Sequence, residues 1–144
     1  MDGFLRDQLE MFRWLHRDAG FDAFQKAVTL LSFTPEYYNE HHQKLLGPQG
    51  GWKELNGRYP AHSRLIDACV NFESRERLAT VRCPSFVLHA ALDVVTSPRT
   101  TLPIERAIPG ARGETWADLA HVVAGKEQKI RFCNRLFDWL QSVP

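Results

Sequence analysis

Apolar residues in the first half of the chain recur at helical spacing. Over residues 4–17, 21–32 and 60–72 they return every three or four positions, with polar side chains between them, which predicts amphipathic helices. A glycine, Gly20, separates the first two segments. The expected apolar faces consist of Leu5, Leu9, Phe12 and Leu15, then Phe21, Phe24, Val28 and Leu31, and finally Leu65, Cys69 and Phe72.

A further helix is predicted from its capping residues. Thr34 is a good N-cap, Pro35 suits the first helical position, and Glu36 complements the positive end of the helix dipole. The helix should run to about residue 46 and end in the glycine- and proline-rich loop at 47–51. The first half is therefore expected to consist of four helices separated by short breaks.

The pattern changes near residue 80. A short apolar run at 85–91 follows a proline, and such runs are typical of strands in a covered parallel sheet. A helix is expected over 99–107, a second strand over 113–117 and a closing helix over 124–141. This βαβα order predicts an α/β protein with a short two-stranded parallel sheet and a right-handed crossover. The expected apolar face of the last helix consists of Ile130, Cys133, Leu136, Phe137 and Leu140.

Two strands alone do not make a stable sheet, because both edges and much apolar surface stay exposed. The apolar faces of the strand at 85–91 and of the helices at 99–107 and 124–141 need a cover. The first-half helices, a second copy of the chain or a separate chain could supply it. We therefore expect association, as a homo-oligomer or with a complementary partner.

Composition narrows the function classes. The chain has 144 residues, 18 basic and 17 acidic side chains and a formal net charge of +1. This balance, without a Lys/Arg block, argues against nucleic acid as a partner. No apolar run approaches the ~20 residues of a membrane helix, and the N-terminus does not resemble a secretory signal. We expect a cytoplasmic protein that acts on a small molecule.

The cysteines and histidines do not predict a metal site. The three cysteines lie far apart without a C-x-x-C pair, which indicates free thiols in a reducing compartment. His41 and His42 are adjacent, whereas zinc-binding helices use an i, i+4 pair. Cys69 and Cys133 fall inside predicted helices and are expected in the core.

The second half contains the most specific motifs. The residues concerned are the segment 77–89, then Asp93-Val94-Val95 and Pro98, then Ile108-Pro109-Gly110-Ala111, Trp116 and Ala120-His121-Val122. Together they resemble the C-terminal end of an α/β-hydrolase fold protein. The upstream helices resemble the helical cap that many members insert before their last two strands. The resemblance implies a partial α/β-hydrolase, with a cap-like region over 1–76 and the C-terminal βαβα part over 77–144.

In that family the last two strands carry the acid and the histidine of a catalytic triad. Asp93 matches the acid and His121 the histidine, in the family's chain order. The carboxylate would accept the Nδ1 proton of the imidazole and fix its tautomer, and the other ring nitrogen would act as a general base. The resemblance implies neither a cofactor nor a metal.

The family's nucleophile is absent. It lies in a G-x-S-x-G turn between a strand and a helix, and none of the serines here has a glycine two positions before it. The serines are Ser32, Ser63, Ser74, Ser85, Ser97 and Ser142. The oxyanion-hole loop of the family also lies upstream of the cap. In addition, Ala90-Ala91 and Leu119-Ala120 stand where the family often has glycine, which alters the turn geometry.

Three functions remain open. The first is a truncated hydrolase that cleaves a small ester or lactone only with a nucleophile-bearing half. The second is a serine-free acid/base enzyme, such as a cyclase, dehydratase or isomerase, that uses Asp93 and His121. The third is a non-catalytic binding or interaction protein. In the first case the cap would line the substrate pocket, although simple helix packing also explains the candidate residues. These are Phe24, Phe33, Tyr37, Tyr38 and Trp52.

Overall fold

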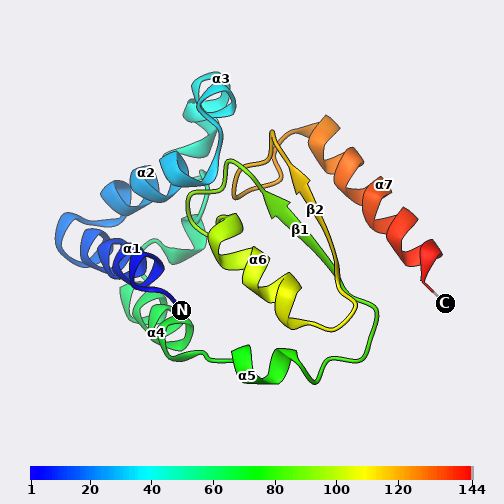
Figure 1. Cartoon of the computed structure of the whole chain (residues 1–144). Coiled ribbons are helices and arrows are strands. Elements are labelled where there is room, and N and C mark those ends of the chain that lie inside the picture. Colours follow the sequence, from blue (N-terminus) through cyan, green and yellow to red (C-terminus); the bar gives the residue numbers. More distant parts are fainter. Residues whose placement is uncertain (144) are drawn as a thin grey trace. The chain divides into compact units, whose positions relative to one another are not determined.

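The computed structural model describes residues 1–143, which divide into two compact units (Figure 1). Unit 1 is Met1–Glu73 and unit 2 begins at Ser74. The sequence places the corresponding boundary at residues 76 and 77. Among the described residues, no helix is both long and apolar enough to cross a bilayer.

Unit 1 is helical, as the hydrophobic pattern predicts. Its elements are α1 (Gly3–Trp14), the π-helical turn η1 (Leu15–Ala19), α2 (Phe21–Ser32), α3 (Pro35–Leu45), the 3-10 turn η2 (Lys53–Leu55) and α4 (Tyr59–Asn71). The Asp2 side chain accepts a hydrogen bond from Leu5 N at 2.9 Å, and the expected cap Thr34 accepts one from Tyr37 N at 3.3 Å. Gly20, with a φ of 88°, makes the break between η1 and α2.

The core of unit 1 joins α1 to α2. Phe12, Phe24 and Val28 are buried, and the Phe12 and Phe24 rings meet edge to face with centroids 6.1 Å apart. Partly buried apolar side chains surround them, namely Leu9, Leu15, Phe21, Ala27, Leu31, Trp52 and Leu55. The predicted apolar faces of the first two helices are therefore confirmed.

The predicted apolar face of α4 is wrong. Leu65, Cys69 and Phe72 are exposed, and the buried residues of this helix are His62 and Ile66. The physical reason is that α4 meets α1 and η1 through polar and aromatic side chains, which no hydrophobic periodicity reveals. Cys69 is consequently not a core residue.

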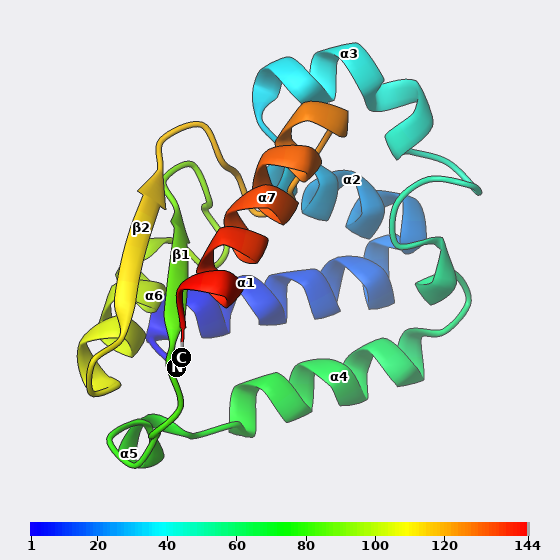
Figure 2. The ribbon, with the colours of Figure 1, turned by 90° about the vertical axis from the view of Figure 1, so that its right-hand side faces the viewer.

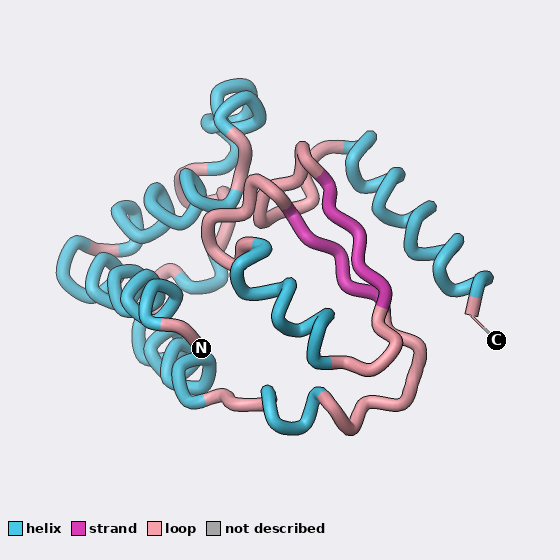
Figure 3. Tube along the Cα trace, in the orientation of Figure 1, coloured by secondary structure: helices cyan, strands magenta, loops and turns pink. Residues whose placement is uncertain are grey.

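Unit 2 has the predicted βαβα order. After the short helix α5 (Arg75–Leu78) come β1 (Phe86–Ala90), α6 (Pro98–Ala107), β2 (Arg112–Trp116) and α7 (Lys126–Ser142). The two strands are parallel, in a register that pairs Phe86 with Arg112 and Ala90 with Trp116 (Figure 3). The α/β class and the two-stranded parallel sheet are thus confirmed.

The helices α6 and α7 cover opposite faces of this sheet (Figure 2). On one face His89 of β1 bonds to Thr101 and Glu105 of α6. On the other face Phe86 stacks on Trp139 of α7 with centroids 5.5 Å apart. Successive side chains of β1 point to opposite faces of the sheet, so the strand contacts α6 on one face and α7 on the other, as expected of a covered strand.

Unit 2 has an unpaired strand edge and an exposed apolar helix face within the described residues. Within residues 1–143 β1 pairs only with β2, so its other edge has no paired strand. The apolar stripe of α7 is exposed at Ile130, Cys133, Leu136, Phe137 and Leu140. The prediction that Cys133 is a core residue is therefore wrong, because the helix meets the sheet through other side chains, Phe132 and Trp139.

Candidate catalytic site

The loops after the two strands of unit 2 lie side by side. Because β1 and β2 are parallel, their carboxyl ends lie at the same end of the sheet, and the loop after each strand begins there. Ala91 N donates to Trp116 O at 3.0 Å, and Leu92 N donates to Leu119 O at 2.9 Å. These backbone bonds join the loop that carries Asp93 to the loop that leads to His121.

Asp93 is fixed by its own turn. Its Oδ1 accepts hydrogen bonds from Val95 N at 2.7 Å and Thr96 N at 2.9 Å, and its Oδ2 accepts one from Thr96 Oγ1 at 2.9 Å. This arrangement is an Asx-type turn, in which the side chain closes the loop that its own residue begins. The carboxylate is therefore oriented before any partner approaches.

The structure brings Asp93 and His121 together. His121 Nδ1 lies 3.0 Å from Asp93 Oδ2, and the side chains are 35% and 5% exposed, respectively. Burial alone would raise the pKa of Asp93, but hydrogen bonds from His121, Thr96 and Val95 outweigh it and hold the pKa below its ordinary value. Asp93 is therefore a carboxylate at neutral pH, and it can accept the Nδ1 proton of His121.

The other ring nitrogen of His121 is available for chemistry. In residues 1–143 no hydrogen-bond partner lies at Nε2, and the side chain is partly open to solvent. With the proton held at Nδ1, Nε2 has a lone pair that can take a proton from a nearby hydroxyl or water. The arrangement is that of a general base oriented by a carboxylate.

Thr96 also belongs to the candidate site, although the sequence pattern does not single it out. Its Oγ1 donates to Asp93 and also lies 3.3 Å from His121 Nδ1, so it touches both members of the pair. A threonine three residues after a loop aspartate is a recognisable signal of such a turn. Its contacts suit a residue that orients the pair. They do not suit a nucleophile, because no separate general base lies beside the hydroxyl in the described residues.

The alanines and leucine at the expected glycine positions do not prevent this geometry. In the described part of the chain, Trp52 alone among the non-glycine residues has a positive φ. The turns at Ala90-Ala91 and Leu119-Ala120 therefore use ordinary backbone conformations, and glycine is not required there.

The five candidate substrate-contacting residues of unit 1 fall into three places. Phe33 stacks on Tyr37 at 5.4 Å between centroids and meets Trp52 edge to face at 6.3 Å. The ring of Tyr38 instead stacks on His42, with centroids 5.9 Å apart. Phe24, 2% exposed, belongs to the core of unit 1.

A cleft of about 750 Å³ in unit 2 lies away from the pair. It runs between β2 and α7, and neither Asp93 nor His121 lines it. Ion pairs occupy its walls, Arg131 with Asp118 at 2.7 Å and Arg135 with Glu114 at 2.6 Å. Throughout residues 1–143, no three His, Cys, Asp or Glu side chains converge as metal ligands.

Solved structures show what this architecture resembles. An esterase from Exiguobacterium antarcticum superposes with a TM-score of 0.74 at 15% identity, over 95% of this chain and 48% of its own. An enol-lactonase from Burkholderia xenovorans gives 0.73 at 17% identity, over 94% and 51%. An α/β-hydrolase from a Medee basin deep-sea metagenome library gives 0.76 at 14% identity, over 99% and 53%.

These similarities establish the fold. The chain has a partial α/β-hydrolase fold, and it spans about half the length of the solved structures that it resembles. No protein-family model and no curated protein matches the sequence. The expected resemblance is thereby confirmed at the level of the fold.

Proposed function

We propose that this chain supplies the acid–histidine part of a Ser-His-Asp triad in a hydrolase that cleaves a small ester or lactone. The observation that carries the proposal is the 3.0 Å contact between His121 Nδ1 and the pre-oriented carboxylate of Asp93. The names of two solved structures with this fold, an esterase and an enol-lactonase, support the substrate class.

The geometry suits both proton transfers of acyl transfer. His121 Nε2 takes the proton of the nucleophile hydroxyl as that oxygen attacks the carbonyl, and Asp93 stabilises the imidazolium that forms. The imidazolium then gives the proton to the leaving alcohol oxygen. In the second half of the reaction water replaces the alcohol. Nε2 takes a proton from the water as it attacks the acyl-enzyme, and the acid is released when the imidazolium returns that proton to the seryl oxygen. The seryl oxygen and the oxyanion donors come from residues outside this sequence.

The open edge of β1 is a suitable docking place for those residues. Ser85 O accepts from Arg112 N and Ala91 N donates to Trp116 O, so the odd-numbered residues of this segment bond toward β2. In a parallel ladder the alternate residues Phe86 and Leu88 therefore direct their backbone groups to the free edge, whereas the carbonyl of Ala90 accepts from Asp93 N at 3.2 Å. A strand from a nucleophile-bearing half could pair there, next to the loop that carries Asp93.

A second candidate function is acid/base catalysis without a nucleophile. It is favoured by one observation, that Nε2 of His121 has no hydroxyl partner within residues 1–143. A cyclisation, dehydration or isomerisation needs only a base that takes a proton and returns it. The same pair of side chains would then act alone, and the purified chain would be active on its own substrate.

The experiment compares the purified chain with a complex of the chain and a G-x-S-x-G-bearing half. Two sources of such a half are to be tried, the reading frame upstream of Met1 and any chain that copurifies with this one. With p-nitrophenyl acetate, the chain alone should be inactive and the complex active.

In that complex His121→Ala and Asp93→Ala should each lower kcat by about 10³-fold or more. Leu30→Ala, at an exposed position of α2, is the control. Hydrolysis by the chain alone, or full activity of the His121→Ala complex, would contradict the proposal.

A further inference from the structure

Two histidines of unit 1 form a buried pair outside the candidate site. His16 on η1 and His62 on α4 are 6% and 5% exposed, and their Nδ1 atoms lie 2.9 Å apart. Only one proton fits between two nitrogens at this distance, so one ring donates and the other accepts. The contact therefore exists only while at least one of the two imidazoles is neutral.

Aromatic rings surround the pair. From α2, Phe24 stacks on His16 at 5.2 Å and lies 4.5 Å from His62, and Phe21 meets the His16 edge at 5.9 Å. From α4, the ring of Tyr59 meets His16 at 5.6 Å. Burial lowers the pKa of His16. Burial, with the nearby His16 and Arg13, lowers the pKa of His62 to about 4.

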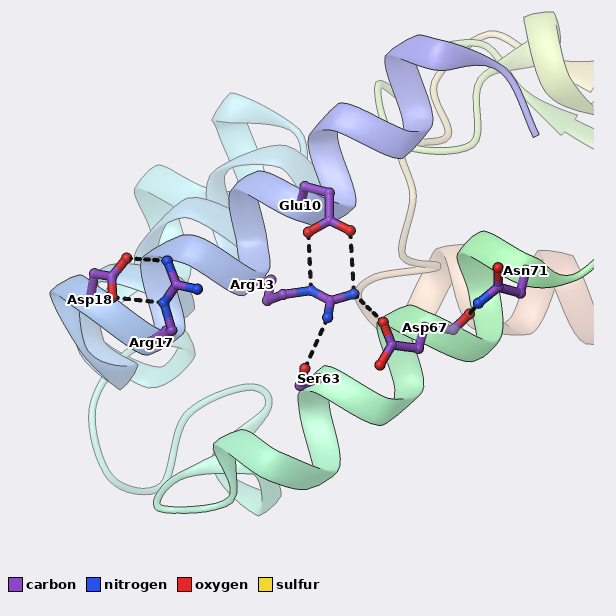
Figure 4. Close-up of polar contacts among 7 residues, drawn as sticks. All are labelled: Glu10, Arg13, Arg17, Asp18, Ser63, Asp67 and Asn71. Atoms are coloured by element: carbon purple, nitrogen blue, oxygen red, sulfur yellow. Dashed lines mark hydrogen bonds and ion pairs between the residues drawn. The ribbon is translucent and has the colours of Figure 1, made fainter.

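The charged groups on the same elements offer no counter-ion. Arg13 of α1 donates to Ser63 at 3.0 Å and to Asp67 at 2.6 Å, both on α4, and pairs with Glu10 at 3.1 Å (Figure 4). The bond with Asp67 raises the pKa of Arg13.

The η1 arginine is paired as well. Arg17 binds Asp18 through bonds of 2.8 and 2.7 Å. These carboxylates are thus already bound to arginines. A doubly protonated histidine pair would face Arg13, Tyr59 and aromatic rings, with no carboxylate contact among the described residues.

We propose that the His16–His62 pair is an acid-sensitive switch that holds η1 against α4 at neutral pH and releases it in mild acid. The second proton would place two positive imidazoliums in contact in an apolar pocket, which like-charge repulsion and desolvation both oppose. The switch does not rest on the proposed hydrolase function, because Asp93 and His121 lie in unit 2 and take no part in it.

The sign of the pH effect follows from the two protonation states. An open or unfolded pair titrates near the ordinary value of 6.5, whereas the closed pair titrates lower, so between these values the open state binds more protons. The closed state is therefore fully favoured above about pH 6.5 and weakens as the pH falls toward 4. For His62 alone the opening equilibrium changes about 100-fold between pH 7 and pH 4.

Hydrogen exchange of the full chain tests the switch. Amide protection in α1 and α4 is measured from pH 7 to pH 4, relative to the strands of unit 2 and corrected for intrinsic exchange. Wild type should lose about 100-fold in relative protection. His62→Gln keeps a hydrogen-bonding side chain that does not titrate, and should lose less than 10-fold. The exposed histidine variant His42→Gln should behave like wild type.

Two results would overturn the proposal. One is relative protection in wild type that does not change with pH, and the other is a His62→Gln chain that loses as much as wild type. If His62→Gln does not fold, the imidazole resonances of wild type decide. Protonation of His62 together with the loss of α4 protection supports the switch, and protonation above pH 6 with α4 still protected excludes it.

Discussion

At the scale of single residues, the candidate site depends on how a buried carboxylate stays ionised. Asp93 is 6% exposed, and burial by itself would favour its neutral form. Two backbone amides, the Thr96 hydroxyl and the His121 imidazole all donate to it and reverse that preference. Asp93 is thereby a charged acceptor that can hold a proton at Nδ1 of His121.

Thr96→Val should raise the pKa of Asp93. The substitution keeps the shape of the side chain but removes the hydroxyl that donates to Oδ2. One lost hydrogen bond to a carboxylate is worth about 1.5–3 kcal/mol, or about one to two pKa units. Carbon-13 NMR of the Asp93 carboxyl measures the change, and Thr96→Ser, which keeps the hydroxyl, should titrate like wild type. An unchanged pKa in Thr96→Val would show that the hydroxyl does not stabilise the charge.

At the scale of elements, a second histidine–carboxylate pair joins β1 to α6. His89 is 1% exposed, its Nδ1 lies 2.7 Å from Thr101 Oγ1, and its Nε2 lies 2.6 Å from Glu105 Oε2. The Glu105 carboxylate reaches His89 across Gly113 of β2, where a Cβ would overlap it. A glycine inside a strand is explained here by the close approach of this side chain.

Gly113→Ala should therefore destabilise the protein by displacing Glu105 from His89. The expected loss is about 1–3 kcal/mol, the cost of leaving a buried polar group without its partner. Urea unfolding measures it, and Gly3→Ala, whose Cβ would meet nothing within 4 Å, is the control.

A double-mutant cycle isolates the mechanism. In a Glu105→Ala background the side chain that the new methyl would displace is already gone, so Gly113→Ala should then cost little. An equal cost in both backgrounds would mean that the strand itself, and not the His89–Glu105 contact, needs glycine at this position.

The sequence predicts the elements of this chain better than their faces. The capping residues at Thr34 and the apolar run at 85–91 mark their helix and strand, because these signals are local. The buried side of α4 is not determined locally, since it is set by contacts with Arg13 of α1 and His16 of η1. No periodicity of apolar residues could show a contact made of histidines and ion pairs.

In the candidate site too, some features follow from the sequence and others depend on the tertiary structure. The chain order and flanking residues single out Asp93 and His121, and their 3.0 Å contact follows from two parallel strands that end at one edge. The Asp-x-x-Thr spacing indicates the turn at Thr96, but only the structure shows that its hydroxyl contacts both Asp93 and His121. The exposure of Cys133 could not be read from helical spacing, because spacing shows that a stripe is apolar but not whether anything covers it.

At the scale of the whole molecule, exposed apolar surface predicts association. Within residues 1–143 the stripe on α7 is exposed and the free edge of β1 has no paired strand. The purified chain should self-associate at micromolar concentration, as measured by sedimentation velocity. Phe137→Glu places a charge in the stripe and should shift the chain toward monomer, whereas Leu30→Glu, at an exposed position of α2, should not. A monomeric wild type with a cooperative thermal transition would contradict this expectation.

The tautomer of His121 is the most direct test of whether Asp93 and this histidine form a catalytic pair. At pH 8, where an ordinary histidine is neutral, a long-range ¹H–¹⁵N spectrum reports which ring nitrogen carries the proton. The 3.0 Å contact predicts a proton at Nδ1 and a bare Nε2 in the wild-type chain, with the preference lost in Asp93→Ala and kept in the control His42→Gln. A proton at Nε2 in wild type, or a tautomer that Asp93→Ala leaves unchanged, would contradict the assignment of His121 as a base oriented by Asp93.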